Sequence, residues 1–270
     1  MTGSVAEASV RRRGTPENPA RSAILFGAAD PIGEATARRM LRAGASVTLC
    51  DVNESGLAAL ARELGEAGAA VRSVAIDPRH PGDPERAMQT ALSAFGSVDV
   101  LVNGLDATIG DAKSTPDGPG HSADSIALSC MQAAIPVMTA GGGGRIVNLV
   151  SSAGRYRSAY MRYAGDAAGA TNEATLGGAV LAATRQLGFE LAPRRIRVNA
   201  VAVGLIRTPE TEQALAKLTD REREFLWEEL SLRRLGEPDE VATVVEFLAS
   251  EASSYLTGAT IDVNGGWWMS

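Results

Sequence analysis

Short, largely apolar runs alternate with amphipathic segments from residue 21 onward. The first four runs lie at 21–26, 46–50, 71–76 and 98–102, and each is followed at once by Gly, Asp or Asn. Continuous apolar runs of this length are typical of strands buried on both faces of a parallel sheet. A polar or glycine residue directly after each run indicates where the strand ends.

Between these runs, apolar residues recur at helical spacing. The segments 32–43, 54–67 and 84–95 are each stopped by a glycine, and Asp83 is the predicted N-cap of the third. The alternation continues with helices predicted at 125–138, 172–191 and 238–248, and strands at 145–150, 197–203 and 259–263. Strands alternating with helices through short connections predict an α/β fold with a doubly wound parallel sheet.

Three segments depart from this alternation. Residues 1–20 are polar and charged, and we expect a disordered N-terminal tail that is neither a signal peptide nor a fold element. Residues 104–121 are rich in Asp, Ser, Pro and Gly and predict a loop. The amphipathic segment 210–230 fits either a mobile helical lid, at about 205–231, or a fixed pair of surface helices.

Composition limits the classes of function. With 270 residues, 45% of them hydrophobic, the chain predicts one large globular domain at 21–270. A net charge of −6 argues against a general affinity for nucleic acid or anionic membrane, and no apolar run approaches a membrane span. Cys50 and Cys130 are expected to be small core residues, not a disulfide or metal set, and a cytoplasmic location is expected.

A set of motifs follows in a fixed order, and over about residues 21–268 the chain resembles the short-chain dehydrogenase/reductase family. The matching pieces are Gly27-Ala-Ala-Asp-Pro-Ile-Gly33, Asp51, Asp77, Leu101-Val-Asn103, Arg145-Ile-Val-Asn-Leu-Val-Ser151, Glu190-Leu-Ala-Pro193, Ile196-Arg-Val-Asn-Ala-Val201, Gly204-Leu-Ile-Arg-Thr208 and Gly265-Gly266. The resemblance implies a single Rossmann-type domain with about seven strands. It also implies a homodimer or homotetramer that pairs through the helices near 122–138 and 172–191.

The first half of the chain predicts a dinucleotide site. Gly27 and Gly33 allow the backbone to approach a pyrophosphate, and the helix that starts near Ile32 directs its positive end toward it. Asp51 ends the second strand, where a carboxylate accepts ribose hydroxyls, and this favours NAD over NADP. Asp30 adds negative charge near the place of a 2′-phosphate.

The resemblance adds Asp77, Asn103 and Thr208 to the expected cofactor contacts. Two prolines depart from the family pattern. Pro31 replaces a glycine of the turn at 27–33, which we call the phosphate turn. Pro78 follows Asp77, at the position where a backbone N–H would meet the adenine. Because proline has no N–H, weakened or altered cofactor binding is an open alternative.

In the family, a tyrosine donates the proton, a lysine four residues later lowers its pKa, and a serine holds the substrate oxygen. Ser151 matches that serine, with a serine that caps a turn as the alternative. No Tyr-x-x-x-Lys occurs anywhere in the chain. Counting back from Glu190 along the helix places Glu173 at the tyrosine position and Gly177 at the lysine position.

Two replacements for the missing tyrosine remain open. Glu173 is a candidate general acid or base if burial raises its pKa, or else a carboxylate that caps the first turn of its helix. The segment 155–171 is longer than in the family and carries Tyr160 and Tyr163. These tyrosines are candidate proton donors, or else aromatic side chains packed on a lid.

Three functions therefore remain. The first is an atypical NAD-dependent oxidoreductase that acts on a carbonyl or alcohol of a small-molecule substrate. The second is a non-redox enzyme on the same scaffold, such as a cyclase, dehydratase or isomerase. The third is a catalytically silent subunit that pairs with an active relative.

Overall fold

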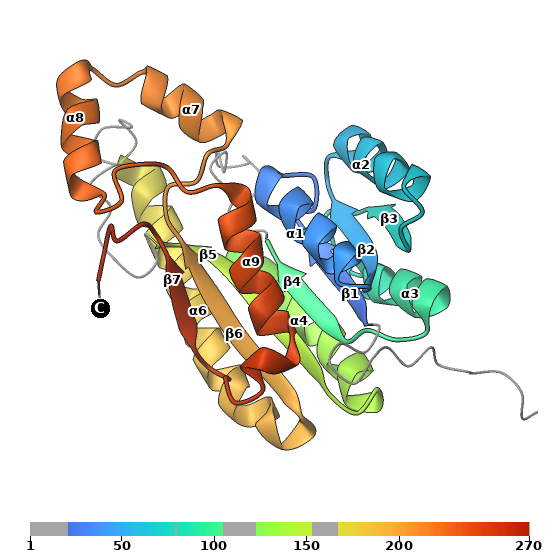
Figure 1. The fold of residues 1–270 in the computed structure, drawn as a ribbon. Helices are drawn as coiled ribbons and strands as arrows, with labels where there is room; N and C mark the ends of the chain where they lie inside the picture. The colour runs from blue at the N-terminus through green and yellow to red at the C-terminus, as the bar shows by residue number, and fades with distance from the viewer. Residues whose placement is uncertain (1–20, 79, 105–122, 153–166, 270) are drawn as a thin grey trace, which may run out of the picture.

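The computed structural model describes residues 21–78, 80–104, 123–152 and 167–269. In this part of the chain, seven parallel strands form one sheet in the order β3-β2-β1-β4-β5-β6-β7 (Figure 1). The strands are β1 (Ser22–Phe26), β2 (Ser46–Asp51), β3 (Val71–Ala75), β4 (Val100–Asn103), β5 (Gly144–Ser151), β6 (Ile196–Val203) and β7 (Thr260–Val263). The order reverses between β1 and β4, and this confirms the predicted doubly wound sheet of seven strands.

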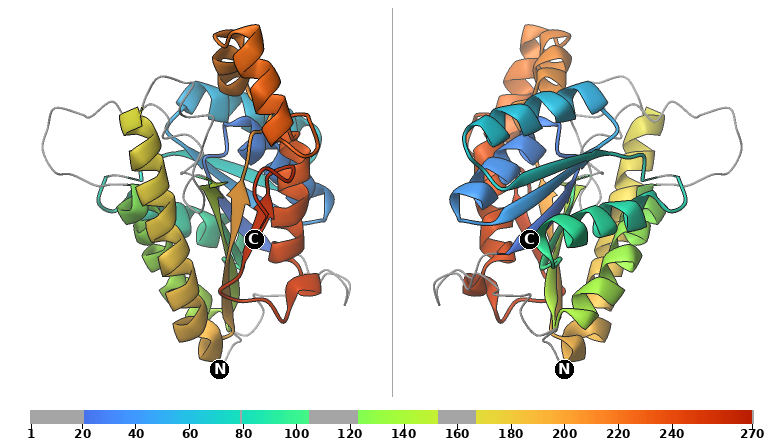
Figure 2. Two further views of the ribbon diagram at one scale, coloured as in Figure 1. Left: turned by 90° about the vertical axis from the view of Figure 1, so that its left-hand side faces the viewer. Right: turned by 90° about the vertical axis from the view of Figure 1, so that its right-hand side faces the viewer.

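Helices cover both faces of the sheet. Helices α1 (Pro31–Arg42), α2 (Glu54–Glu66) and α9 (Pro238–Ala249) lie on one face, and α3 (Asp83–Phe95), α4 (Ala123–Ala140) and α6 (Ala167–Leu191) lie on the other (Figure 2). Successive side chains of a strand point to opposite faces. In β1, Ala23 and Leu25 therefore join one core, and Ile24 and Phe26 join the other. Cys50 and Cys130 are both buried free thiols in the second core.

Most helices and strands begin and end within two residues of the predicted positions. Helix α6 is longer and begins at Ala167. The predicted N-cap of α3 is wrong. Gly82, with φ of +88°, holds the cap position, and Asp83 is the first helical residue. The Asp83 carboxylate instead accepts the backbone N–H of Asp77 at 2.9 Å, and the glycine adopts a left-handed conformation that other residues reach only with strain.

The charged segment near 210–230 forms two helices, α7 (Pro209–Ala216) and α8 (Asp220–Glu229), which lie beyond the carboxyl ends of the strands (Figure 1). They share a small apolar cluster with the chain end. Its buried members are Leu215, Leu218, Leu226, Leu230, Leu235 and Trp267. No helix in the described ranges is long and apolar enough to span a membrane.

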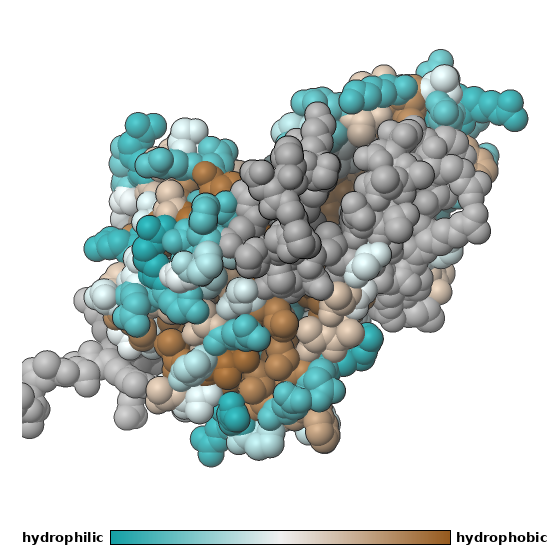
Figure 3. All heavy atoms as spheres, turned by 180° about the vertical axis from the view of Figure 1, so that it is seen from behind, coloured by the Kyte–Doolittle hydropathy of each residue, from teal (hydrophilic) through white to brown (hydrophobic). Residues whose placement is uncertain are grey.

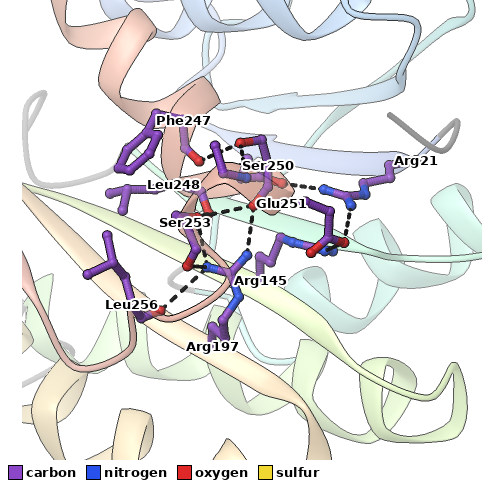
Figure 4. A network of polar contacts seen from close by, with 11 residues as sticks. Arg21, Arg145, Arg197, Phe247, Leu248, Ser250, Glu251, Ser253 and Leu256 are labelled. Carbon is purple, nitrogen blue, oxygen red and sulfur yellow. Dashed lines mark hydrogen bonds and ion pairs between the residues drawn. The ribbon is translucent and has the colours of Figure 1, made fainter. Parts of the chain in front are cut away.

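At the amino ends of the strands, three arginines hold the carboxyl end of α9 (Figure 4). Arg21, only 8% exposed, donates to the Ala249 carbonyl and to Glu251, both at 2.6 Å. Arg145 pairs with the same carboxylate. Arg197 donates to the carbonyls of Ser250 and Ser253 in and beside the short helix η4 (Glu251–Ser253). The last carbonyls of a helix lack partners within it, so these arginines complete the hydrogen bonding of α9.

Candidate functional site

The turn between β1 and α1 brings the start of α1 into close contact with the end of the strand. Gly27 has φ of +75°, a region that favours glycine. A Cβ added at Gly33 would lie 2.0 Å from the Gly27 carbonyl oxygen, so only glycine fits where α1 approaches the turn. The positive end of α1 therefore opens at the carboxyl edge of the sheet, as predicted from these glycines.

Asp30 occupies the start of that helix. It is the N-cap of α1, and its Oδ1 accepts the backbone N–H groups of Ile32 at 2.7 Å and Gly33 at 2.8 Å. Burial raises the pKa of Asp30 to about 6; the two N–H groups oppose this shift, and the charges of Asp51 and Glu210 add to it. The Asp30 carboxylate thus accepts hydrogen bonds from two of the backbone N–H groups that a phosphate would use.

Asp51 lies at the end of β2, at the predicted position. Its Oδ2 accepts the N–H of Ala29 at 2.9 Å, and its Oδ1 accepts the N–H of Asn53 at 2.8 Å. The carboxylate therefore links the phosphate turn to the second strand. Each carboxylate oxygen accepts more than one hydrogen bond, so both remain able to accept a ribose hydroxyl.

Asp77 follows β3, two strands from the phosphate turn. It is half-buried, and its Oδ2 lies 3.6 Å from Nδ1 of His80. The proline after it, Pro78, is buried. This region keeps a carboxylate near the expected adenine position, but Pro78 offers no N–H there.

A series of hydrogen bonds between buried polar side chains joins β4, β5 and α6, and we call it the buried polar chain. Sequence analysis identified only its first member, Asn103. Asn103, at the end of β4, donates through Nδ2 to Oδ1 of Asn148 on β5 at 2.9 Å. Asn148 donates to the Thr184 hydroxyl on α6 at 2.9 Å, and that hydroxyl donates to the Val180 carbonyl. The three side chains are 2% exposed or less, so the chain fixes α6 against β5.

One signal in the sequence could have identified this chain: Asn148 is a polar residue inside the apolar run 145–150. The structure adds that Asn148 pairs in register with Asn103 on the neighbouring strand. A buried polar side chain needs a hydrogen-bonding partner, so an amide in such a run points to another polar group nearby. The Oδ1 of Asn103 is buried and accepts no hydrogen bond from the residues that the structure describes.

Ser151 is the last residue of β5 and is half-buried, next to the end of β6. Glu173 belongs to α6, but its side chain lies outside what the structure describes. Tyr160 and Tyr163 also lie outside the described residues. Gly177, at the expected lysine position, is buried in α6. The described part of the site therefore brings Ser151 to the same edge of the sheet as the phosphate turn.

Thr208 begins α7, where its hydroxyl accepts the N–H of Thr211 at 3.2 Å. The chain reaches it from β6 through Gly204, where a Cβ would lie 2.6 Å from the Asn264 Cα, so the backbones are in close contact. This connection carries α7 to the phosphate turn. Glu210, in the first turn of α7, acts on the charge of Asp30.

The edge of the sheet therefore fits a dinucleotide in its backbone shape. The glycine turn, Asp51, Asn103 and Ser151 all stand at the carboxyl ends of their strands. Together these groups can position a nucleotide beside a polar substrate.

Comparison with known proteins agrees with this geometry. A family model described as Enoyl-(Acyl carrier protein) reductase matches residues 27–268. The 7alpha-hydroxysteroid dehydrogenase of Bacteroides fragilis is 33% identical over 252 residues, covering 90% of this chain and 92% of that protein. The 3-oxoacyl-acyl-carrier-protein reductase of Thermotoga maritima is 33% identical over 248 residues, covering 90% and 96%.

A solved structure gives the same result at the level of the fold. The crystal structure of a 7 alpha-hydroxysteroid dehydrogenase complexed with NADH and 7-oxo glycochenodeoxycholic acid superposes with a TM-score of 0.77 and 26% identity. The match covers 93% of this chain and 95% of that one. The chain belongs to the short-chain dehydrogenase/reductase family.

Proposed function

We propose that the chain is an NAD-dependent oxidoreductase that acts on a carbonyl or alcohol of a small molecule. The observation that carries this proposal is the glycine turn at the start of α1 together with Asp51 at the end of β2. The related 7 alpha-hydroxysteroid dehydrogenase was solved in complex with NADH, and this supports a nicotinamide cofactor for this chain. Asp30, Asp51 and Glu210 would repel a 2′-phosphate, and this favours NAD over NADP.

In this proposal the residues of the chain orient the substrate and move a proton. When bound, the nicotinamide would supply or accept the hydride. The Ser151 hydroxyl would hold the substrate oxygen. Glu173, or Tyr160 or Tyr163 from the segment 155–171, would exchange a proton with that oxygen in place of the family's tyrosine. In the same proposal, helices α7 and α8 would act as a lid that limits the access of water.

The sequence supports two further candidates because it lacks a Tyr-x-x-x-Lys motif. A non-redox cyclase, dehydratase or isomerase would use Ser151, Glu173 and the tyrosines for acid–base chemistry alone. A silent subunit would keep the fold and pair with an active relative. NADH binding separates the first proposal from a cofactor-free enzyme, and turnover separates any enzyme from a silent subunit.

We also propose that the chain forms a homodimer or homotetramer through α4 and α6. The face that carries these helices shows a broad apolar area between charged regions (Figure 3). Phe189 on α6 is 81% exposed in the single chain. Exposed apolar area of this kind marks contact surfaces. Sedimentation analysis of the purified protein should give twice or four times the mass of one chain, and a single-chain mass would contradict the proposal.

Titration with NADH and NADPH by calorimetry tests the cofactor. We expect NADH to bind more tightly than NADPH. Asp51→Asn keeps an acceptor for the Ala29 N–H but removes the charge. It should lower the affinity for NADH by about tenfold and reduce the preference for NADH over NADPH. Asp220→Asn, an exposed acid at the start of α8, is the matched control and should change neither affinity. Equal NADH affinity in Asp51→Asn and the unaltered chain would remove Asp51 from the site.

Turnover tests the acid–base group. Glu173→Gln should lose at least a hundredfold in kcat with the fold intact, because general acid–base catalysis contributes about that much. Glu190→Gln, an exposed carboxylate on the same helix, should retain activity. Near-normal turnover of Glu173→Gln would turn attention to Tyr160→Phe and Tyr163→Phe.

A further inference from the structure

Four backbone N–H groups of the phosphate turn are already bound by other groups of the chain. Ala28 donates to the Cys50 carbonyl, and Ala29 donates to Asp51. Ile32 and Gly33 both donate to Oδ1 of Asp30. A phosphate that binds any of these four donors must displace its present acceptor.

Asp30 is the acceptor that can leave. The Cys50 carbonyl belongs to the backbone of β2, and Asp51 also accepts the Asn53 N–H and is assigned to the ribose. Asp30 reaches its N–H groups through a side chain with two rotatable bonds, so it is the acceptor that a phosphate can displace. The charged groups of the described residues that act on it are Asp51, at the end of β2, and Glu210, on α7, and both are acidic. Glu34 lies one turn further along α1 but pairs with Arg38.

We propose that Asp30 competes with the cofactor pyrophosphate for the N–H groups of Ile32 and Gly33, so that nucleotide binding requires the protonation and release of its side chain. This inference rests on the proposed function, because it concerns the same nucleotide. In addition to favouring NAD over NADP, Asp30 would then determine the pH range in which the nucleotide binds. Pro31 strengthens the competition, because it removes an N–H that would have given the phosphate another donor.

The direction of the pH dependence follows from the charges. A pyrophosphate beside Asp30 disfavours the ionised carboxylate, so the bound state holds more protons than the free state. Burial already raises the pKa of Asp30 to about 6 in the free chain. Nucleotide affinity should therefore rise as the pH falls toward 6, by about tenfold between pH 7.5 and pH 5.5, with uptake of close to one proton per nucleotide at pH 7.5 and less at pH 5.5.

ADP-ribose is a suitable probe, because its pyrophosphate is a diester whose charge does not change in this pH range. Calorimetry at pH 5.5, 6.5 and 7.5, in buffers of different ionisation enthalpy, measures both the affinity and the number of protons taken up. NADH at pH 6.5 and 7.5 serves as a second probe. Asp30→Asn keeps a good helix cap without a titrating group and should bind ADP-ribose with equal affinity at every pH. Asp220→Asn, which removes the same charge from the start of α8, should retain the pH dependence of the unaltered chain.

Each outcome separates this inference from the function on which it rests. Tighter binding at low pH with proton uptake, both lost in Asp30→Asn, supports the competition. Binding that does not depend on pH in the unaltered chain, or the same dependence in Asp30→Asn, overturns the competition and leaves the proposed function standing. Failure of both proteins to bind ADP-ribose and NADH at every pH overturns both.

Discussion

The two ends of the parallel sheet carry opposite charges and use them differently. At the amino end, Arg21, Arg145 and Arg197 surround Glu251 and the last carbonyls of α9. At the carboxyl end, Asp30 and Asp51 hold the N–H groups of the phosphate turn, with Glu210 nearby.

The hydrogen bonds at the two ends have different consequences. The arginines meet the negative end of a helix and an acid, so charge and hydrogen bonding agree. Although burial alone raises the pKa of Glu251, the charges of Arg145 and Arg21 hold it below its usual value. Asp30 also meets a helix end of opposite sign, but it is buried beside other acids, and this raises its pKa. The amino end is thus built for stability, and the carboxyl end is built so that a ligand can replace one of its own groups.

Gly33→Ala should have the largest effect on stability and nucleotide binding, and it changes the carboxyl end of the sheet. Its Cβ would lie 2.0 Å from the Gly27 carbonyl oxygen, so α1 must move away from the turn. We expect the free energy of unfolding to fall by about 3 kcal/mol and nucleotide binding to be lost. Gly65→Ala in α2, where a Cβ would lie 3.9 Å from the Val71 side chain in an ordinary contact, is the control and should stabilise the chain by about 0.5 to 1 kcal/mol. Chemical denaturation of both variants measures this difference, and equal stability would contradict the close contact.

Arg21→Met should break the amino end alone. It removes the donor to the Ala249 carbonyl and one partner of Glu251, and we expect the free energy of unfolding to fall by roughly 2 to 3 kcal/mol. Nucleotide affinity should not change, because this change lies at the opposite edge of the sheet. Arg62→Met, on the exposed side of α2, should have little effect on either quantity. A loss of nucleotide affinity in Arg21→Met would show that the two ends are coupled.

The pH dependence of stability should report the buried charge of Asp30. Its pKa is raised in the folded chain, so the native state holds its proton more tightly than the unfolded state. Stability from this group is present below the unfolded pKa of about 4 and is lost as the pH rises to about 6. Between pH 4 and pH 7, Asp30→Asn should therefore gain about 2 kcal/mol in free energy of unfolding relative to the unaltered chain. A constant difference across this range, measured by denaturation, would show that Asp30 does not titrate as a buried group.

Thr184→Val should give the smallest effect, between the two ends. It removes the acceptor of the Asn148 amide in the buried polar chain, at a cost of about 1 kcal/mol in the free energy of unfolding. Thr139→Val is the control, because the Thr139 hydroxyl bonds only to the carbonyl four residues earlier, on the exposed side of α4. If the free energy of unfolding falls no more in Thr184→Val than in Thr139→Val, the buried polar chain adds nothing to stability.

The sequence predicted the strands and helices because they depend on local patterns. Apolar runs followed by Gly27, Asp51 and Asn103 located three strand ends and, with them, the edge of the sheet that carries the site. The error at Asp83 arose because a carboxylate before a helix has two uses, and the contact with the Asp77 N–H depends on a turn that the pattern does not describe.

The contacts between distant residues could not be predicted in the same way. Arg21 and Glu251 are 230 positions apart, and only the folded sheet brings them together. Asp30 is a further example, because it both adds negative charge near the cofactor and caps α1. Its negative charge near a phosphate was expected, but its hold on the Ile32 and Gly33 N–H groups depends on a side-chain conformation that no spacing rule gives. Glu173, Tyr160 and Tyr163 remain predictions for the proton donor.

The most direct test is a crystal structure of the chain with NADH bound. We expect pyrophosphate oxygens within hydrogen-bond distance of the Ile32 and Gly33 N–H groups, the Asp30 side chain turned away from them, and the adenosine ribose hydrogen-bonded to Asp51. A nucleotide bound elsewhere, or bound at this turn while Asp30 still accepts both N–H groups, would contradict this expectation.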